Sequence, residues 1–344
     1  METKDLHNQS RRFFLDNLKV LLTVLVVFHH SAQAYCDCNW AYKPSNPQEY
    51  IDGLWHFLST NAAFFMGLFF FISGYFVPRS YDKQGFGRFL GKKVLRLLVP
   101  MAAMTAFLSL ATGIFETGHT WFLGSLFFFC LVYALLRLVL KPAPEGCLSR
   151  PTIVGMLIAA IVMGVGSYFI REVSPQDNWI RILWILNIEP AHYLQYILMF
   201  ALGVLAGRFG WFEKMTRGTG LTALLIGVAL CLGNYARTDG AWSYFVYRWF
   251  GIYESLLCVF LCFGLVWFFR EFCQWSGSFW RWSAGQAYGV YIVHLPLILV
   301  VQNLLDEVWI GAWGKFLTVA VISTIISFGF TYLLRLIPGV KKVL

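Results

Sequence analysis

Long apolar runs recur along the whole chain, and they restrict its fold more than any other feature of the sequence. An α-helix needs about 20 apolar residues to cross a bilayer. Hydrophobic residues make up 58 % of the 344 residues and charged residues 13 %, whereas a soluble globular protein has about 25 % charged residues. The sequence therefore predicts an all-α, polytopic integral membrane protein. Residues 1–344 are expected to form a single membrane domain without an additional soluble domain.

Ten stretches are long and apolar enough to be predicted as membrane spans. They are residues 19–35, 55–77, 96–114, 121–140, 152–170, 192–207, 219–234, 245–269, 286–303 and 315–337. The sixth is the least regular, because Glu189-Pro190 interrupts the apolar sequence before it. The preceding piece, 182–188, could instead be a re-entrant or interfacial segment. The first run lacks a small-residue cleavage site after it, so we expect a retained span rather than a signal peptide.

The basic residues are distributed unevenly between the two sides of the predicted membrane. If the N-terminus is inside, only six of the 27 Lys and Arg residues fall on the outer side, namely Lys43, Arg171, Arg181, Arg237, Arg248 and Lys315. The positive-inside rule then predicts that both termini are cytoplasmic and that the protein lies in the cytoplasmic (inner) membrane. The net charge of +9 is mostly this topological signal and requires no nucleic-acid partner.

The first span, with the sequence KVLLTVLVVFHHS, carries a lysine and two histidines. Ionisable groups inside a bilayer are costly and are functional candidates by default. Lys19 and His30 lie close to three helical turns apart, on one helix face and about 16 Å apart along the axis, whereas His29 points roughly 80–100° away. A cation at the mouth and a neutral base further in would suit an anionic carrier that delivers a group. A snorkelling lysine and a structural histidine would explain the pattern equally well.

Two motifs lie near the cytoplasmic side of the second and third spans. In the sequence Ser73-Gly74-Tyr75, the glycine allows helices to approach closely, and the flanking hydroxyls can form hydrogen bonds between helices. Lys93 and Arg96 end a basic stripe at the edge of the third span. Positive-inside anchoring explains most such stripes, but these two side chains could also bind phosphate from the membrane side.

Polar residues near the outer side of later spans form a further set of candidates. His119 and Trp121 open the fourth span, where Trp is a common interfacial anchor and His119 could position a polar acceptor. Glu254 is the clearest carboxylate inside an apolar run, and it could pair with Arg248 or with a histidine. The loop 36–54 is a candidate lid, a candidate acceptor contact or a plain connector. Its cysteines have no second ligand pair at a usable distance, so no metal site is expected.

Near the end of the chain, Tyr288, Tyr291 and His294 recur at spacings of three and should share one helix flank. With this stripe the ordered motifs resemble the acyltransferase-3 family of integral membrane acyltransferases, with a layout similar to its glucan biosynthesis protein C-like members. The matching residues are Lys19 and His30, Phe71 to Tyr75, Lys93 and Arg96, His119 to Leu123, 196–208, and Tyr288 to Pro296. Lys19 and Lys93 stand where arginine is frequent in the family; lysine keeps the charge but lacks the bidentate fork.

The resemblance implies an O-acyltransferase that moves an acyl group, acetyl or in some cases succinyl, from cytoplasmic acyl-CoA to a hydroxyl of a carbohydrate or other small acceptor at or across the membrane. Acyl-CoA, with acetyl-CoA as the expected donor, and the lipid bilayer are then its partners. The resemblance implies catalytic roles for His30 and Lys19. It implies cofactor-binding roles for Lys93, Arg96, Ser73 and Tyr75, and substrate-binding roles for His119, Trp121, Tyr291, His294 and Glu254.

Alternatives remain at two points. His30 could act as a general base on the acceptor hydroxyl or carry the acyl group as a covalent acyl-histidine relay. The intramembrane histidines and Glu254 could instead form a proton relay in a transporter or flippase of a small polar solute. Against this reading, the sequence shows no inverted repeat and no paired broken helices. The acceptor and the oligomeric state are not readable from the sequence.

Overall fold

The computed structural model describes residues 12–36, 38, 40–113, 117–141, 150–182, 186–237 and 240–344. Within this part of the chain, nine helices are long and apolar enough to cross a membrane. One of them covers Leu54–Thr112, which at 59 residues is long enough for two passes. It bends at Gly85, whose φ of 70° lies in the left-handed region that glycine tolerates. The prediction of an all-α polytopic membrane protein is confirmed, and the ten predicted spans are compatible with these nine helices if Leu54–Thr112 passes twice.

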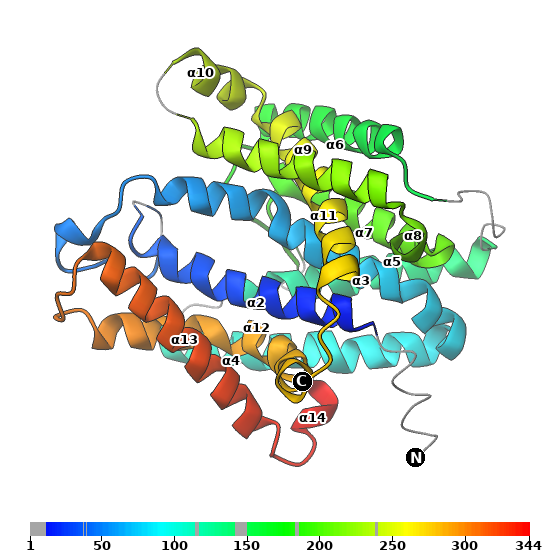
Figure 1. Cartoon of the computed structure of the whole chain (residues 1–344). Coiled ribbons are helices and arrows are strands. Elements are labelled where there is room, and N and C mark those ends of the chain that lie inside the picture. The colour runs from blue at the N-terminus through cyan, green and yellow to red at the C-terminus, as the bar shows by residue number, and fades with distance from the viewer. Residues whose placement is uncertain are drawn as a thin grey trace.

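The spanning helices form one bundle with short connections (Figure 1). In chain order the elements are α2 (Phe13–Gln33), η1 (Pro47–Glu49), α3 (Leu54–Lys93), η2 (Val94–Leu98), α4 (Val99–Thr112), η3 (Gly118–Thr120), α5 (Trp121–Val139), α6 (Ile153–Val173), β1 (Ile180–Ile182), β2 (Leu186–Ile188), α7 (Pro190–Phe209), α8 (Trp211–Lys214), α9 (Arg217–Tyr235), α10 (Ala241–Arg248), α11 (Phe250–Phe272), α12 (Ser278–Leu304), α13 (Ala312–Leu334) and α14 (Val340–Val343). η2 is a π-helix, and η1 and η3 are 3₁₀-helices.

The structure refines two of the predicted segments. The described residues of 180–188 form an antiparallel strand pair, in which β1 pairs with β2 and Ile180 lies opposite Ile188. Whether this piece is re-entrant or interfacial stays a prediction. The sixth span begins at Pro190, a residue whose fixed φ suits the first helical position. The eighth span begins at Phe250 rather than at 245, because the chain leaves helical geometry at Trp249, after the separate helix α10.

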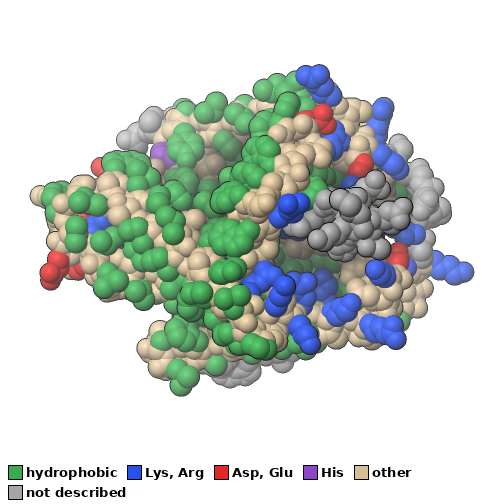
Figure 2. Space-filling model, turned by 60° about the horizontal axis from the view of Figure 1, so that its bottom comes forward, with side chains coloured by type: hydrophobic (Ala, Val, Ile, Leu, Met, Phe, Trp, Pro, Cys, Tyr) green, Lys and Arg blue, Asp and Glu red, His purple; other side chains and the backbone are tan. Residues whose placement is uncertain are grey.

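The basic side chains gather toward one end of the molecule. Figure 2 shows Lys and Arg at the end where Figure 1 places both termini, while apolar side chains cover much of the remaining surface in view. The exposed members are Lys83, Arg88, Lys92, Arg96, Lys214, Arg217, Arg281, Lys341 and Lys342. This charge asymmetry is the basis for the predicted cytoplasmic orientation of that end, which stays a prediction.

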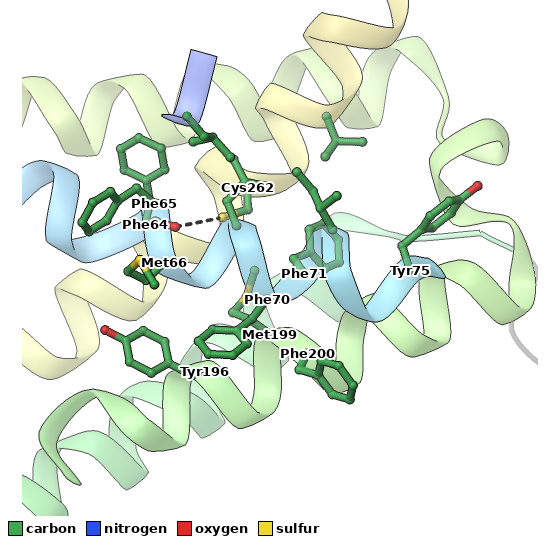
Figure 3. Close-up of a cluster of buried hydrophobic side chains, with 14 of the residues drawn as sticks. Phe64, Phe65, Met66, Phe70, Phe71, Tyr75, Tyr196, Met199, Phe200 and Cys262 are labelled. Atoms are coloured by element: carbon green, nitrogen blue, oxygen red, sulfur yellow. Dashed lines mark hydrogen bonds between the residues drawn. The ribbon is translucent and has the colours of Figure 1, made fainter. Parts of the chain in front are cut away.

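The core is centred on α3, which packs against α7 and α11. The buried aromatic run of α3 faces Tyr196, Met199 and Phe200 of α7, and Cys262 of α11 lies near the Phe64 carbonyl (Figure 3). Gly74 packs so closely on α7 that an added Cβ would stand 2.3 Å from the Phe200 carbonyl oxygen. Across the same contact, a Cβ on Gly203 would stand 2.1 Å from the Phe71 carbonyl oxygen. The close helix approach predicted at Gly74 is confirmed.

This contact predicts that Gly74→Ala destabilises the protein. The added methyl group would meet backbone that can give way only by separating two helices, so we expect the free energy of unfolding to fall by about 1–3 kcal/mol. The matched control is Gly91→Ala, at a position of the same helix where an added Cβ meets nothing within 4 Å and where alanine has the higher helix propensity. Denaturant unfolding of both variants in detergent checks this, and equal stabilities would contradict the close contact.

Candidate active site

Three histidines from distant parts of the chain meet in the bundle. His30 comes from α2, His119 from η3 and His294 from α12. The centroid of the His294 ring lies 5.2 Å from that of His30 and 4.8 Å from that of His119. His294 and His119 are buried and His30 is half-buried. The structure thus brings together three of the residues predicted from separate motifs.

A proline explains the position of His119. Pro296 lies within α12 and has no N–H, so it cannot donate to the carbonyl of Ile292 four residues earlier. That carbonyl accepts instead from His119 Nε2, at 2.8 Å. The ring is held at the helix by a backbone group that the helix itself leaves unpaired. His119 was predicted at the membrane interface, but its side chain is buried in the bundle.

Tyr288 and Tyr291 of α12 each form a hydrogen bond to the backbone of a neighbouring segment. The Tyr291 hydroxyl donates to the His119 carbonyl at 2.5 Å. The Tyr288 hydroxyl donates to the carbonyl of Arg96 in η2. That carbonyl lies four residues before a proline, Pro100, which has no N–H to donate to it. The stripe therefore binds the backbones of the two segments that precede α4 and α5.

Hydrogen bonds fix the neutral tautomers of two of the histidines. The Tyr291 carbonyl can only accept, so His294 carries its hydrogen on Nδ1 and donates it at 2.7 Å. His119 carries its hydrogen on Nε2, by the same reasoning. The opposite nitrogens, His294 Nε2 and His119 Nδ1, are buried without a hydrogen-bond partner among the described residues. The cluster therefore presents ring nitrogens with lone pairs, as a proton-accepting site would.

A segment of the outer loop covers His30. The Trp40 ring stacks on the His30 ring, with centroids 5.4 Å apart and an interplanar angle of 18°. Trp40 Nε1 donates to Gln302 Oε1 at 3.1 Å, and Gln302 Nε2 donates to the Ser31 carbonyl at 3.4 Å. The sequence had left this loop open between lid, acceptor contact and connector. It contacts the candidate base directly through Trp40, which sequence reasoning missed although it is the single tryptophan of the loop.

The rest of this segment is fastened to the end of α12 and the beginning of α13. Lys315 Nζ contacts Glu49 Oε1 at 2.5 Å, and both side chains are essentially inaccessible to solvent. The hydroxyls of Tyr42 and Ser45 donate to the carboxylate of Asp306 at 2.5 and 2.6 Å. The hydrogen bonds from Ser45 and Tyr42 hold the pKa of Asp306 below its usual range. We call residues 40–50 the outer strap, after the side of the membrane that the sequence predicts for them.

Glu254 belongs to a second polar cluster, at the C-terminal end of α6 and the N-terminal ends of α7 and α11. It forms an ion pair with Arg171, and its other oxygen lies 3.0 Å from His192 Nε2. His192 Nδ1 lies 2.7 Å from Glu189 Oε2. Carboxylates contact both ring nitrogens, so both donate and the ring is an imidazolium.

The sequence left open whether Glu254 pairs with Arg248 or with a histidine, and the structure shows its partners. Of the two expected pairings, the one with a histidine is confirmed, and the one with Arg248 is wrong, because Arg248 contacts Glu172. Trp121 lies between this cluster and the three histidines. It is two residues after His119 in the chain, and its ring stacks on that of Tyr196. Tyr196 in turn stacks on His192. Among the described contacts, Glu254 touches none of the three clustered histidines.

The remaining predicted residues lie toward the basic end. Lys19 lies within α2, and its Nζ is 4.5 Å from the centroid of the Phe76 ring. Phe76 is the residue directly after the Ser73-Gly74-Tyr75 motif. Tyr75 stacks on Phe212 and donates to Glu213 at 2.6 Å, so it fastens α3 to α8. Ser73 and Lys93 are half-buried, and the side chain of Arg96 is exposed. The first-span lysine and the second-span motif are therefore neighbours, as an entry from this end would need.

The comparison with known families decides what kind of protein this is. The model of the acyltransferase-3 family, which describes an acyltransferase domain, matches residues 12–334. The chain belongs to the acyltransferase-3 family. It is thus a multi-pass membrane acyltransferase, and the match does not favour the alternative of a transporter. The narrower resemblance to glucan biosynthesis protein C-like members stays a prediction. Searches of curated proteins and of solved structures gave no significant match.

Proposed function

We propose that this acyltransferase moves an acyl group, acetyl in the first instance, from cytoplasmic acyl-CoA to a hydroxyl of a carbohydrate or similar acceptor, with His30 as general base. The observation that carries the proposal is the contact of His30 with His294 and, through it, with His119. His30 is the half-buried member of this set, whereas His119 and His294 are buried. A neutral imidazole has a ring nitrogen with a free lone pair that can accept a proton, as a general base must.

The reaction then needs one proton transfer in each direction. His30 takes the proton of the acceptor hydroxyl as its oxygen attacks the thioester carbonyl. The C–S bond breaks, a C–O ester bond forms, and the CoA thiolate leaves. The imidazolium returns the proton to the thiolate, so His30 ends neutral and no external oxidant or reductant is consumed. The buried, unpaired ring nitrogens of His119 and His294 would accept hydrogen bonds from donor groups of either substrate.

The phosphates of CoA would bind at the basic end. Lys19, Lys93 and Arg96 are the cations predicted for this role in the first and third spans, and ammonium and guanidinium groups both bind phosphate. Lys19 and His30 lie on one continuous helix, α2, about 16 Å apart. The thin pantetheine arm could extend over that distance, with its thioester near His30.

Binding of acyl-CoA tests this proposal without knowledge of the acceptor. The purified protein should be thermally stabilised by acetyl-CoA or succinyl-CoA, by about 2.7 kcal/mol at a ligand concentration of 100 Kd. The double variant Lys93→Gln/Arg96→Gln should lose most of this shift, as should wild type given a pantetheine thioester without phosphate. Arg217→Gln, an exposed cation at the same end, is the control and should keep the shift. No stabilisation at millimolar acyl-CoA would sink the proposal.

A further inference from the structure

The ring of His30 has one hydrogen-bonding neighbour in the described part of the chain. His30 Nδ1 lies 2.7 Å from Oε1 of Gln33, three residues further along α2. Residues three apart are neighbours on a helix surface, so the pair is built into one element and does not depend on tertiary packing. The ring also contacts two other rings, those of Trp40 and His294. Nε2 is therefore the ring nitrogen left for a substrate.

We propose that Gln33 is a positioning residue that holds His30 in the tautomer with its hydrogen on Nδ1, so that Nε2 is the atom that accepts the hydroxyl proton. The amide oxygen only accepts hydrogen bonds, and a neutral imidazole has one donor and one acceptor nitrogen. A donor Nδ1 leaves the lone pair on Nε2. This inference rests on the proposed role of His30 as general base.

Gln33 also acts during the proton transfer itself. When Nε2 takes the proton, the ring becomes an imidazolium, and its positive charge is shared with the Nδ1–H group. The hydrogen bond from Nδ1 to the Gln33 oxygen then becomes charge-assisted and stronger. The imidazolium gives the Nε2 proton to the CoA thiolate, and the ring returns to its starting tautomer with Nδ1–H still bound.

A second contact restrains the plane of the same ring. Trp40 stacks on His30, and Gln302 holds Trp40 through its indole N–H while it also binds the carbonyl of Ser31, the residue after His30. Rotation of the side chain about its Cα–Cβ bond would break both the stack on Trp40 and the hydrogen bond to Gln33. The orientation and the tautomer are thus fixed by separate groups.

Two substitutions of Gln33 distinguish a tautomer role from a packing role. Gln33→Met keeps the length of the side chain and removes the acceptor, so kcat should fall roughly 10–100-fold with KM for acyl-CoA changed less than about twofold. Gln33→Glu keeps an acceptor-only group at Nδ1. Its activity should stay well above that of Gln33→Met, and the acid limb of its pH–rate profile should shift up by about one unit or more, because a carboxylate favours the imidazolium.

The assay uses permeabilised membranes of the host cells, which contain the full-length variant and the natural acceptor. Transfer of label from the radioactive acyl-CoA that gives the larger thermal shift is followed from pH 5 to 9. The titratable groups that face His30 are His29 on its own helix and His294 from α12, with His119 behind His294. Gln84→Met is the control, because Gln84 donates only to Ser80 of its own helix, and it should leave the profile unchanged.

The outcomes separate this inference from the proposed function. Full activity of Gln33→Met beside an inactive His30→Ala would overturn the role of Gln33 and leave His30 as the base. Loss of activity in Gln33→Glu equal to that in Gln33→Met, without a shifted profile, would also overturn it, because Gln33 would then act as a donor or by packing. An active His30→Ala would instead remove the proposed function on which the inference rests.

Discussion

Replacement of His30 by alanine is expected to lower acyl transfer by roughly 10²–10⁴-fold, the range that a lost general base accounts for. The reason is local, since the variant removes the proton acceptor and leaves the half-buried ring site empty while α2 continues through Phe13–Gln33. The measurement is the gain of one acyl mass unit on cell-surface glycans and small metabolites, by mass spectrometry of cells that carry either form. The amount of protein in the membrane should be unchanged.

His29→Ala is the matched control for this experiment. His29 is the adjacent residue, but its ring packs on Phe65 of α3, with centroids 4.9 Å apart, and it is buried. Its loss should therefore reduce stability more than chemistry and give the milder loss of transfer. If the two variants were equally active, or if His30→Ala kept near-normal turnover, His30 would not be the base. Rapid-quench trapping of an acylated wild-type protein would point to the covalent relay instead.

Replacement of Lys315 by methionine is expected to lower the free energy of unfolding by about 3–5 kcal/mol. Lys315 and Glu49 are both essentially inaccessible to solvent, and their contact fastens the outer strap to α13. Removal of the cation leaves a carboxylate buried without its ion partner, which costs far more than the loss of an exposed pair. The unfolding free energy in detergent and faster amide hydrogen exchange over residues 40–50 are the two measurements.

Two comparisons make the Lys315 result interpretable. Glu49→Leu/Lys315→Met removes both charges, and stability should return to near the wild-type value, because apolar replacements of a buried pair are often neutral. Arg248→Met breaks an ion pair whose side chains are 47 % and 59 % exposed, and this should cost less than about 1 kcal/mol. A Lys315→Met effect no larger than that of Arg248→Met would show that the strap does not depend on the buried pair.

The outer strap connects this stability to the site. Trp40 belongs to the strap and stacks on His30, so a strap released from α13 would also free the ring that lies against the base. The Lys315→Met variant should therefore lose transfer as well as stability, and the double variant should recover both. This places the long outer loop in the architecture of the site rather than among plain connectors.

Much of the site could be predicted because its parts are marked by local patterns. Lys19 and His30 share a helix, and their spacing alone places them on one face. The tyrosine stripe and His294 likewise follow from spacing within one helix, and Gly74 from the need for close helix contact. These predictions concern residues whose relation is set by the geometry of a single element, and the structure brings His30, His119, Tyr291 and His294 to one place.

The assignments that sequence could not make depend on partners far along the chain. Glu254 was expected to pair with Arg248 or with a histidine. Only the packing of α6 beside α11 places Arg171, rather than Arg248, at its carboxylate. Trp40 could have faced lipid or solvent. Its contact with His30 requires the bond to Gln302, 262 residues away. The pairing of β1 with β2 satisfies backbone groups, and the apolar sequence of this piece gave no indication of it.

The sequence by itself determined that this chain crosses a membrane as helices, because apolar runs of spanning length admit no other backbone that satisfies its own hydrogen bonds in lipid. It also determined its family through motifs in a fixed order. Only the tertiary structure decided which nitrogen meets which partner. Pro296 leaves the Ile292 carbonyl without a donor, a fact that the sequence contains. His119, 173 residues earlier, donates the hydrogen bond to this carbonyl, because η3 packs against α12.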